Sequence, residues 1–455
     1  MNQAVRMVAP SRANSLIDAP IGRSLLFLSL PSVLAMVLQT SVSVAEVFYV
    51  GRLGTEALAS LALVYPMYML MMTLSSGALG GMTAGAIARA LGTGDGAGAD
   101  RIAWNALLLA SIVGVVVSLL FLANTERLFT WLGGGNGVLD QAMHYASVLF
   151  SGAVAIWVFN ILMAMLRGSG QMKLSAAITA GVVCVQIPLM GVLILGWGGF
   201  DPMGISGAPM AILVAFGLGV VAAAVSLLRS TSSVRLSRRG FALDLPFLVG
   251  MVRTTSIAAL SPVLTVFSVV LLTRFVGQFG QAALAGYGIG SRLEFLLIPL
   301  VFGIGTALTT LVGHNVGAGR LSRALRIAWT GAGAAALIAG TIGGFFALFP
   351  GAWANHFSDD PDVLASAYAY LRIAGLGFPF VAIGLALYFA SQGANRVGWP
   401  LVASSVRILI VVLGAQFVLS GAHVELTDLY TVILLAMFAF GGANVLAIRL
   451  GAWRR

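Results

Sequence analysis

Residues 50–59 read VGRLGTEALA, and residues 276–285 read VGQFGQAALA. The two decapeptides match at a shift of 226 positions (276 minus 50). Two further anchors recur at a shift of 225 positions (326 minus 101, and 392 minus 167): RIAW at 101–104 and 326–329, and RGSG at 167–170 against QGAN at 392–395. Three separate anchors at nearly one offset indicate that the chain is an internal repeat of two halves.

The composition around these anchors is that of a membrane protein. Of the 455 residues, 59% are hydrophobic and 9% are charged, and the mean hydropathy is +0.99. Soluble domains carry about 25% charged residues, and apolar runs longer than about 18 residues indicate membrane spans. Such runs lie near 24–50, 57–90, 103–123, 142–166, 174–196 and 207–228, then near 250–273, 283–312, 326–349, 364–390, 401–420 and 428–448.

These runs predict an all-α integral membrane protein of twelve transmembrane helices in two six-helix lobes. We expect a cytoplasmic N-terminal segment (1–23), an N-lobe (24–228), a basic linker (229–249) and a C-lobe (250–455). Because each half has an even number of helices, both halves enter the membrane in the same direction. This is a parallel repeat, and transporters place their substrate sites at the interface between such repeats.

The positive charge follows the predicted topology. With the N-terminus inside, 20 of the 25 basic residues fall on inner segments, and the other five are Arg52, Arg127, Arg274, Arg292 and Arg372. Cytoplasmic loops carry such an excess of Lys and Arg. We therefore expect a multi-pass protein of the bacterial inner membrane with both termini in the cytoplasm. The net charge of +10 is then a topology signal and not a nucleic-acid footprint.

The residues that hold metals or form disulfides give no pattern. Cys184 is the single cysteine, which excludes an intramolecular disulfide framework and a cysteine-based zinc cluster. The four histidines (His144, His314, His356 and His423) are expected in or near loops and share no ligand spacing. We expect no metal site, and no clustered Asp, His or Glu supports an enzyme.

Two acidic residues lie within predicted spans, and such residues are functional candidates by default. Ser32, Gln39, Ser43 and Glu46 follow one another at i, i+7, i+11 and i+14, which places them on a helix stripe about 60° wide. A polar stripe on an apolar helix must face a hydrated cavity or another helix. Glu46 in such a low-dielectric site could carry a proton. The alternative is an interfacial acid near the outer boundary, and the residues alone leave both open.

The second acid, Glu294, also allows two interpretations. It could be a cavity charge that attracts cationic substrates, or it could pair with Arg292 or Arg274 as a structural ion pair. The helix predicted at 250–273 has its own polar residues, Ser261, Thr265 and Ser268, but the repeat puts Leu272 where Glu46 lies. If an acid couples transport, the N-terminal half carries it.

The repeated VGxxGxxALA turns, the GHNVGAGR segment (313–320) and the loops LRGSG (166–170) and SQGAN (391–395) resemble those of MATE transporters. These are multidrug and toxic compound extrusion proteins of the MOP flippase superfamily. The resemblance implies that Glu46 stands at the family's helix-1 acid, which is usually Asp, and Pro31 at a proline that lets this helix bend. It also implies that Gln186 is the family's polar position in helix 5, and that Met190 replaces an acid there.

The resemblance implies an exporter of amphipathic, mostly cationic compounds that works by alternating access, without a catalytic residue or cofactor. Proton antiport of the DinF-like type is favoured, because the acids that NorM-type sodium-coupled members use in helices 7 and 10 are absent. We expect a monomer whose partners are small organic substrates and membrane lipids. Sodium coupling, and a flippase for lipid or polysaccharide precursors, remain alternatives, as do a channel and a membrane enzyme from other classes.

Overall fold

The computed structural model describes residues 16–131, 136–229, 234, 236, 244–421 and 425–454, and the regular structure among them is helical. The first half comprises α2 (Ile21–Gly51), α3 (Thr55–Met72), the π-helical η1 (Thr73–Leu79), α4 (Gly80–Gly92), α5 (Gly96–Trp131), α6 (Asn136–Ser151), α7 (Ala153–Gly168), α8 (Met172–Leu195), η2 (Gly204–Ser206) and α9 (Gly207–Arg229). The second half comprises α10 (Leu245–Gly277), α11 (Gln281–Gly317), α12 (Leu321–Leu348), α13 (Gly351–Ala354), α14 (Pro361–Ala374), η4 (Gly375–Gly377), α15 (Phe378–Gly393), α16 (Gly398–Leu419) and α17 (Leu426–Arg449).

These helices confirm the predicted fold class. Within the described part of the chain, 11 segments are long and apolar enough to cross a membrane, and α6 and α7, bent by 50° at their junction, form a twelfth. The segment α3–η1–α4 counts as one span, as does α14–η4–α15. Each predicted span has its counterpart, with ends that differ by a few residues.

The stretch predicted as the linker, 229–249, is shorter in the structure. α10 begins at Leu245, and Asp244 caps it by accepting a hydrogen bond from the Phe247 amide at 2.9 Å. This is a typical N-cap arrangement, so the last positions of the stretch are helical. Most other linker positions, and residues 1–15 of the N-terminal segment, lie outside the described residues.

The repeated sequence motif marks a backbone conformation that glycine alone adopts readily. Gly54 (φ 116°) precedes α3, and Gly280 (φ 101°) precedes α11, with both residues near ψ 180°. This region of φ and ψ is essentially restricted to glycine. The loops at 167–170 and 392–395 likewise place Gly170 (φ 80°) and Asn395 (φ 58°) at equivalent left-handed positions. The two halves thus resemble each other most where turns restrict the residue type.

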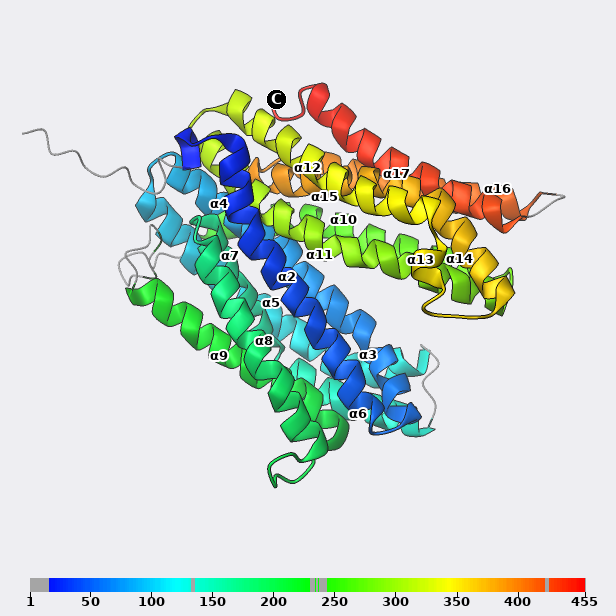
Figure 1. The fold of residues 1–455 in the computed structure, drawn as a ribbon. Coiled ribbons are helices and arrows are strands. Elements are labelled where there is room, and N and C mark those ends of the chain that lie inside the picture. The colour runs from blue at the N-terminus through cyan, green and yellow to red at the C-terminus, as the bar shows by residue number, and fades with distance from the viewer. Residues whose placement is uncertain are drawn as a thin grey trace, which may run out of the picture.

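The two bundles form a V in Figure 1. They converge on the side at which α2 begins and α17 ends, here called the terminal side, and they diverge toward the opposite, far side. α2–α9 form one arm, and α10–α17 form the other. This is the arrangement of two lobes that the internal repeat predicts.

One helix belongs to both lobes. The second half of α2 contributes Val42 and Tyr49 to the N-lobe core, whereas its first half contributes Leu25 and Leu28 to the C-lobe core. Pro31 lies between the two sets, inside the helix. Figure 1 shows α2 running diagonally from the corner where the arms meet into the N-lobe arm. α2 therefore packs into the cores of both lobes.

Candidate functional site

Glu46 lies in the second half of α2 and is buried, with 4% of its surface exposed. The Tyr145 hydroxyl, from α6, donates a hydrogen bond to its Oε1 at 2.5 Å. Tyr145 is itself 2% exposed. In the described part of the chain, Glu46 forms no ion pair. The carboxyl group therefore has a buried hydroxyl donor and no charged partner among the described residues.

The aromatic residues of α3 complete the surroundings of this carboxyl group. Tyr68 is buried and interacts electrostatically with Glu46, as does Tyr65. Ser43, one turn before Glu46, is half-buried. The acid therefore lies among hydroxyl groups from three helices (α2, α3 and α6).

The other polar residues of the predicted α2 stripe differ in how deeply they are buried. Gln39 is half-buried, but Ser32 is buried, donates to the Leu28 carbonyl at 3.3 Å and lies 3.5 Å from the Met172 sulfur. Ser32 thus packs against α8 in this conformation. Pro31, beside it, is half-buried.

The predicted polar residue of helix 5, Gln186 in α8, is fully buried. Within the described residues neither its amide nitrogen nor its amide oxygen has a hydrogen-bond partner. Buried amides are usually paired, with protein or with ordered water. Met190, one turn further along, is also fully buried. Gln186 is therefore a polar group in the N-lobe whose hydrogen-bonding capacity is unused.

The polar residues of α10 are mostly engaged locally. Thr265 donates to the Ser261 carbonyl at 3.0 Å, and Ser268 donates to the Leu264 carbonyl at 2.8 Å. Ser261 is 4% exposed, and its hydroxyl has no partner among the described residues. Hydroxyls that bond to the preceding helical turn are common in apolar helices.

Glu294 forms an ion pair, but neither with Arg292 nor with Arg274. Its Oε1 lies 3.9 Å from Nη2 of Arg407 on α16, and its Oε2 accepts from the Tyr370 hydroxyl at 2.9 Å. Arg407 was one of the 20 basic residues predicted to lie on inner segments. It is 4% exposed and lies well inside α16, so that prediction was wrong. Arg292 is exposed and lies over the Phe357 ring instead. A charge that close to Glu294 supports the structural interpretation of this acid.

The two acids share one kind of partner. Tyr145 and Tyr370 differ by 225 positions (370 minus 145), the offset of the internal repeat. The acids themselves are not equivalent, because Glu46 is on the first helix of its lobe and Glu294 is on the second. Neither tyrosine was predicted as a site residue, although a tyrosine retained at the repeat offset within apolar helices is a signal that could have identified them.

The lobes are joined on the terminal side by a set of hydrogen bonds, here called the seam. Arg89 Nη1 at the end of α4 donates to the carbonyls of Gln392 (3.1 Å) and Gly393 (2.7 Å) at the end of α15. Gln392 Nε2 donates to the Gly77 carbonyl at 2.8 Å, and Thr310 donates to the Arg167 carbonyl at 2.9 Å. These bonds link η1, α4 and α7 of the N-lobe to α11 and α15 of the C-lobe.

Two of the four histidines lie within helices, His144 in α6 and His314 in α11, whereas His356 lies in a turn and His423 is outside the described residues. His314 is within α11, 1% exposed, and its Nδ1 lies 2.9 Å from the Thr310 carbonyl. The described residues contain no group of three His, Cys, Asp or Glu side chains that could hold a metal ion.

Comparison of the sequence with known proteins finds relatives that match both lobes. The model of the MatE family matches residues 31–192 and 258–417, one segment in each lobe. The FAD transporter of Shewanella oneidensis is 26% identical over 405 residues, which cover 88% of each chain. The probable multidrug resistance protein NorM of Thermotoga maritima is 26% identical over 407 residues, covering 88% of this chain and 86% of the relative.

Solved structures show the same fold. An outward-facing multidrug resistance MATE family transporter of the MOP superfamily superposes with a TM-score of 0.90 at 23% identity, over 98% of this chain and 99% of the other. A MOP superfamily transporter from Pyrococcus furiosus gives a TM-score of 0.89 at 24% identity over the same shares. With a family match in both lobes and this shared fold, the chain belongs to the MatE family.

Proposed function

We propose that the protein is a secondary active exporter that exchanges amphipathic, mostly cationic organic compounds for protons by alternating access. The observation that carries the proposal is Glu46, a buried intramembrane acid with a tyrosine hydroxyl as its partner and no ion pair among the described residues. Glu294 contrasts with it, because Arg407 compensates its charge. Glu46 is thus the acid better suited to exchange a proton during transport.

The energy available from one proton is sufficient for export. Moving one charge through 100 mV yields about 2.3 kcal/mol, which sustains a concentration ratio of roughly fifty. Pro31 would allow α2 to change direction between its two halves, because a proline removes one helical hydrogen bond. The predicted lining residues, from Ser32, Gln39 and Ser43 to Gln186 and Ser261, would contact the substrate in states where the lobes separate around them.

The seam then describes one state of the cycle. If the terminal side is cytoplasmic, as the charge distribution predicts, the closed seam and the divergent far side correspond to an outward-facing monomer in the inner membrane. Tags at the N-terminus, within 229–244 and at the C-terminus should then all report the cytoplasm. A periplasmic linker would overturn this orientation.

The test is transport by purified protein in proteoliposomes, with proton and sodium gradients imposed separately. Because relatives include multidrug resistance proteins and an FAD transporter, an organic cation and FAD are both assayed. We expect wild-type export of the cation to follow the pH gradient without sodium. Transport that requires sodium at zero pH gradient would favour the NorM-type alternative over the DinF-like one.

The matched variants are Glu46→Gln and Glu294→Gln at equal reconstituted amounts. Glu46→Gln keeps the size of the side chain but cannot exchange a proton, so uphill export should be lost while the protein inserts normally. Glu46→Asp should retain partial activity. Glu294→Gln should lower stability more than coupling, because it leaves Arg407 without a counter-ion. Near-normal uphill export by Glu46→Gln would remove this residue from the mechanism.

A further inference from the structure

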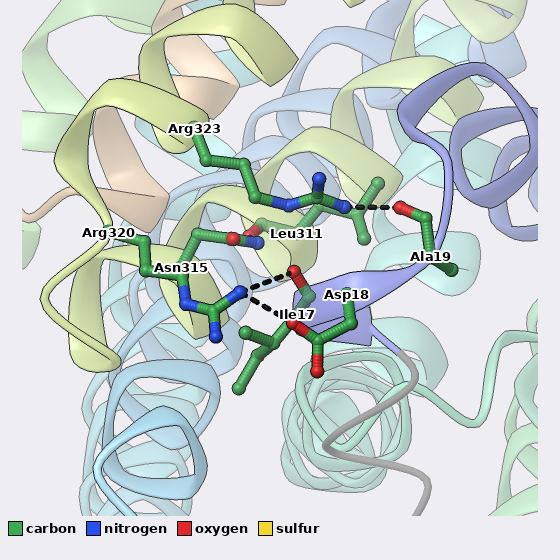
Figure 2. Close-up of polar contacts among 7 residues, drawn as sticks. All are labelled: Ile17, Asp18, Ala19, Leu311, Asn315, Arg320 and Arg323. Atoms are coloured by element: carbon green, nitrogen blue, oxygen red, sulfur yellow. Dashed lines mark hydrogen bonds and ion pairs between the residues drawn. The ribbon is translucent and has the colours of Figure 1, made fainter.

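The residues immediately before α2 are attached to the C-lobe. Figure 2 shows Ile17, Asp18 and Ala19 against the corner between α11 and α12. Asp18 Oδ1 accepts from Arg320 Nη1 at 2.5 Å, and the same nitrogen lies 3.4 Å from the Ile17 carbonyl. Arg323 Nη2 donates to the Ala19 carbonyl. We call these five residues the α2 clamp.

The clamp should attach α2 to the C-lobe more strongly than its ion pair alone would. The Arg320 and Asp18 side chains are 49% and 64% exposed, and an exposed ion pair contributes little by itself. However, both arginines also bind main-chain carbonyls, which fixes the path of the backbone, and the Ile17 side chain is 9% exposed. The clamp thus combines charge, backbone hydrogen bonds and apolar burial.

The same segment also packs on the N-lobe, through Leu16 beside Gly170 and through Met172, which is buried with Leu25 and Leu28, but its polar contacts there are weaker than the clamp. Ser32 approaches only the sulfur of Met172, at 3.5 Å, and a thioether is a weak acceptor. The Lys173 ammonium lies 4.4 Å from the centroid of the Phe27 ring at an exposed position. When the lobes separate on the terminal side, we expect these contacts to break before the clamp does.

α2 is therefore held at both ends by different lobes. Its start is on the C-lobe through the clamp and through Leu25 and Leu28, and its end is in the N-lobe, where Glu46 meets Tyr145. A rotation of one lobe against the other must be taken up within this helix. Pro31, which lies between the two anchored parts, is where the helix has lost a backbone hydrogen bond.

We propose that Asp18, Arg320 and Arg323 keep the first half of α2 on the C-lobe throughout the transport cycle, so that a change at Glu46 moves the C-lobe. This inference rests on the proposed function for the identity of the ion. The three residues touch neither proton nor substrate, and they act by positioning α2. Without them, α2 could change at Glu46 while the C-lobe stays in place, and protons would cross without export.

The first experiment measures the number of protons that enter per organic cation exported. Arg320→Gln/Arg323→Gln should raise this ratio about fivefold, which corresponds to about 1 kcal/mol of lost attachment. The control is Arg326→Gln, the same type of substitution at an exposed position one turn further along α12; it removes one positive charge where the double variant removes two, and it should leave the ratio unchanged. The charge exchange Asp18→Arg/Arg320→Asp should recover part of the coupling, which a merely structural role would not require. An unchanged ratio in the double variant would overturn the proposal.

The second experiment asks whether the clamp stays closed during the cycle. Asp18→Cys/Arg320→Cys, in a Cys184→Ser background, should be poorly coupled until a short bifunctional thiol reagent joins the two cysteines, which should restore coupled export. If the cross-linked protein stops transporting, the clamp has to open and the proposal is wrong. Substrate counterflow, which needs alternating access but no ion gradient, is measured in parallel. A wild-type protein active in counterflow but indifferent to a pH gradient would refute the proposed proton coupling while the cross-link still tests the clamp.

Discussion

The seam between the lobes makes a quantitative prediction for Arg89→Gln. Arg89 donates two hydrogen bonds, of 3.1 and 2.7 Å, to carbonyls at the C-terminal end of α15, where a positive charge also interacts favourably with the helix dipole. Hydrogen bonds to a charged group contribute about 1.5–3 kcal/mol each. Gln can retain one weaker bond, so we assign a net loss of about 2 kcal/mol, or roughly thirtyfold in the ratio of closed to open terminal side.

The assay is the distance between spin labels at Thr93→Cys and Arg396→Cys, both at exposed positions on opposite lobes, in a Cys184→Ser background. Reconstituted Arg89→Gln should show a longer distance population that the parent lacks, and Arg89→Lys should be intermediate. Arg101→Gln, an exposed charge at the start of α5, is the control. A distance distribution that is the same with and without Arg89 would refute the idea that these bonds hold the seam closed.

Three further substitutions test the site and the turns. Tyr145→Phe should lower the melting temperature, because it leaves a buried carboxylate without its donor at a cost of about 1–3 kcal/mol, as differential scanning fluorimetry would detect. Arg407→Leu should be destabilised by about 3–5 kcal/mol, and adding Glu294→Leu should recover most of that loss; a double variant no more stable than the single one would disprove the ion pair. Gly54→Ala should cost about 1–3 kcal/mol through backbone strain, whereas Gly51→Ala, whose Cβ would meet only the Leu58 side chain of α3 at an ordinary contact distance, should melt near the wild-type temperature.

The two lobes could be predicted from the sequence because the repeat and the hydrophobic runs depend on local properties of the chain, namely turn conformation and helix length. The VGxxG motif recurs since Gly54 and Gly280 occupy a conformation closed to other residues, so a turn requirement became visible as a repeat. The length of each apolar run predicts a span directly. The residues alone left Glu46 either in a low-dielectric site or at the outer boundary, and only the packing of α2 against α6 shows that it is buried.

The partners of the acids could not be predicted in this way. Arg407 was counted with the inner arginines because the positive-inside rule weighs residues near helix ends and ignores pairing across helices. Its contact with Glu294 depends on how α11 and α16 pack, which no single-helix periodicity reveals. The division of α2 between two cores is likewise a tertiary property, since Leu25 and Val42 look alike as apolar positions on one helix.

The split packing of α2 also sets the order in which the chain can be completed during synthesis. α2 is the first described helix to be made, yet the buried cluster that contains Leu25 and Leu28 consists, apart from Met172 of α8, of residues from 272 onward, in α10, α11 and later helices. Until those helices are inserted, the start of α2 faces lipid or the insertion machinery, while its second half can already assemble with α3 and α6. An N-lobe expressed alone therefore carries an unmatched apolar surface at the start of α2, and a C-lobe expressed alone lacks a piece of its own interior. The repeat makes the lobes similar, but it does not make them independent folding units.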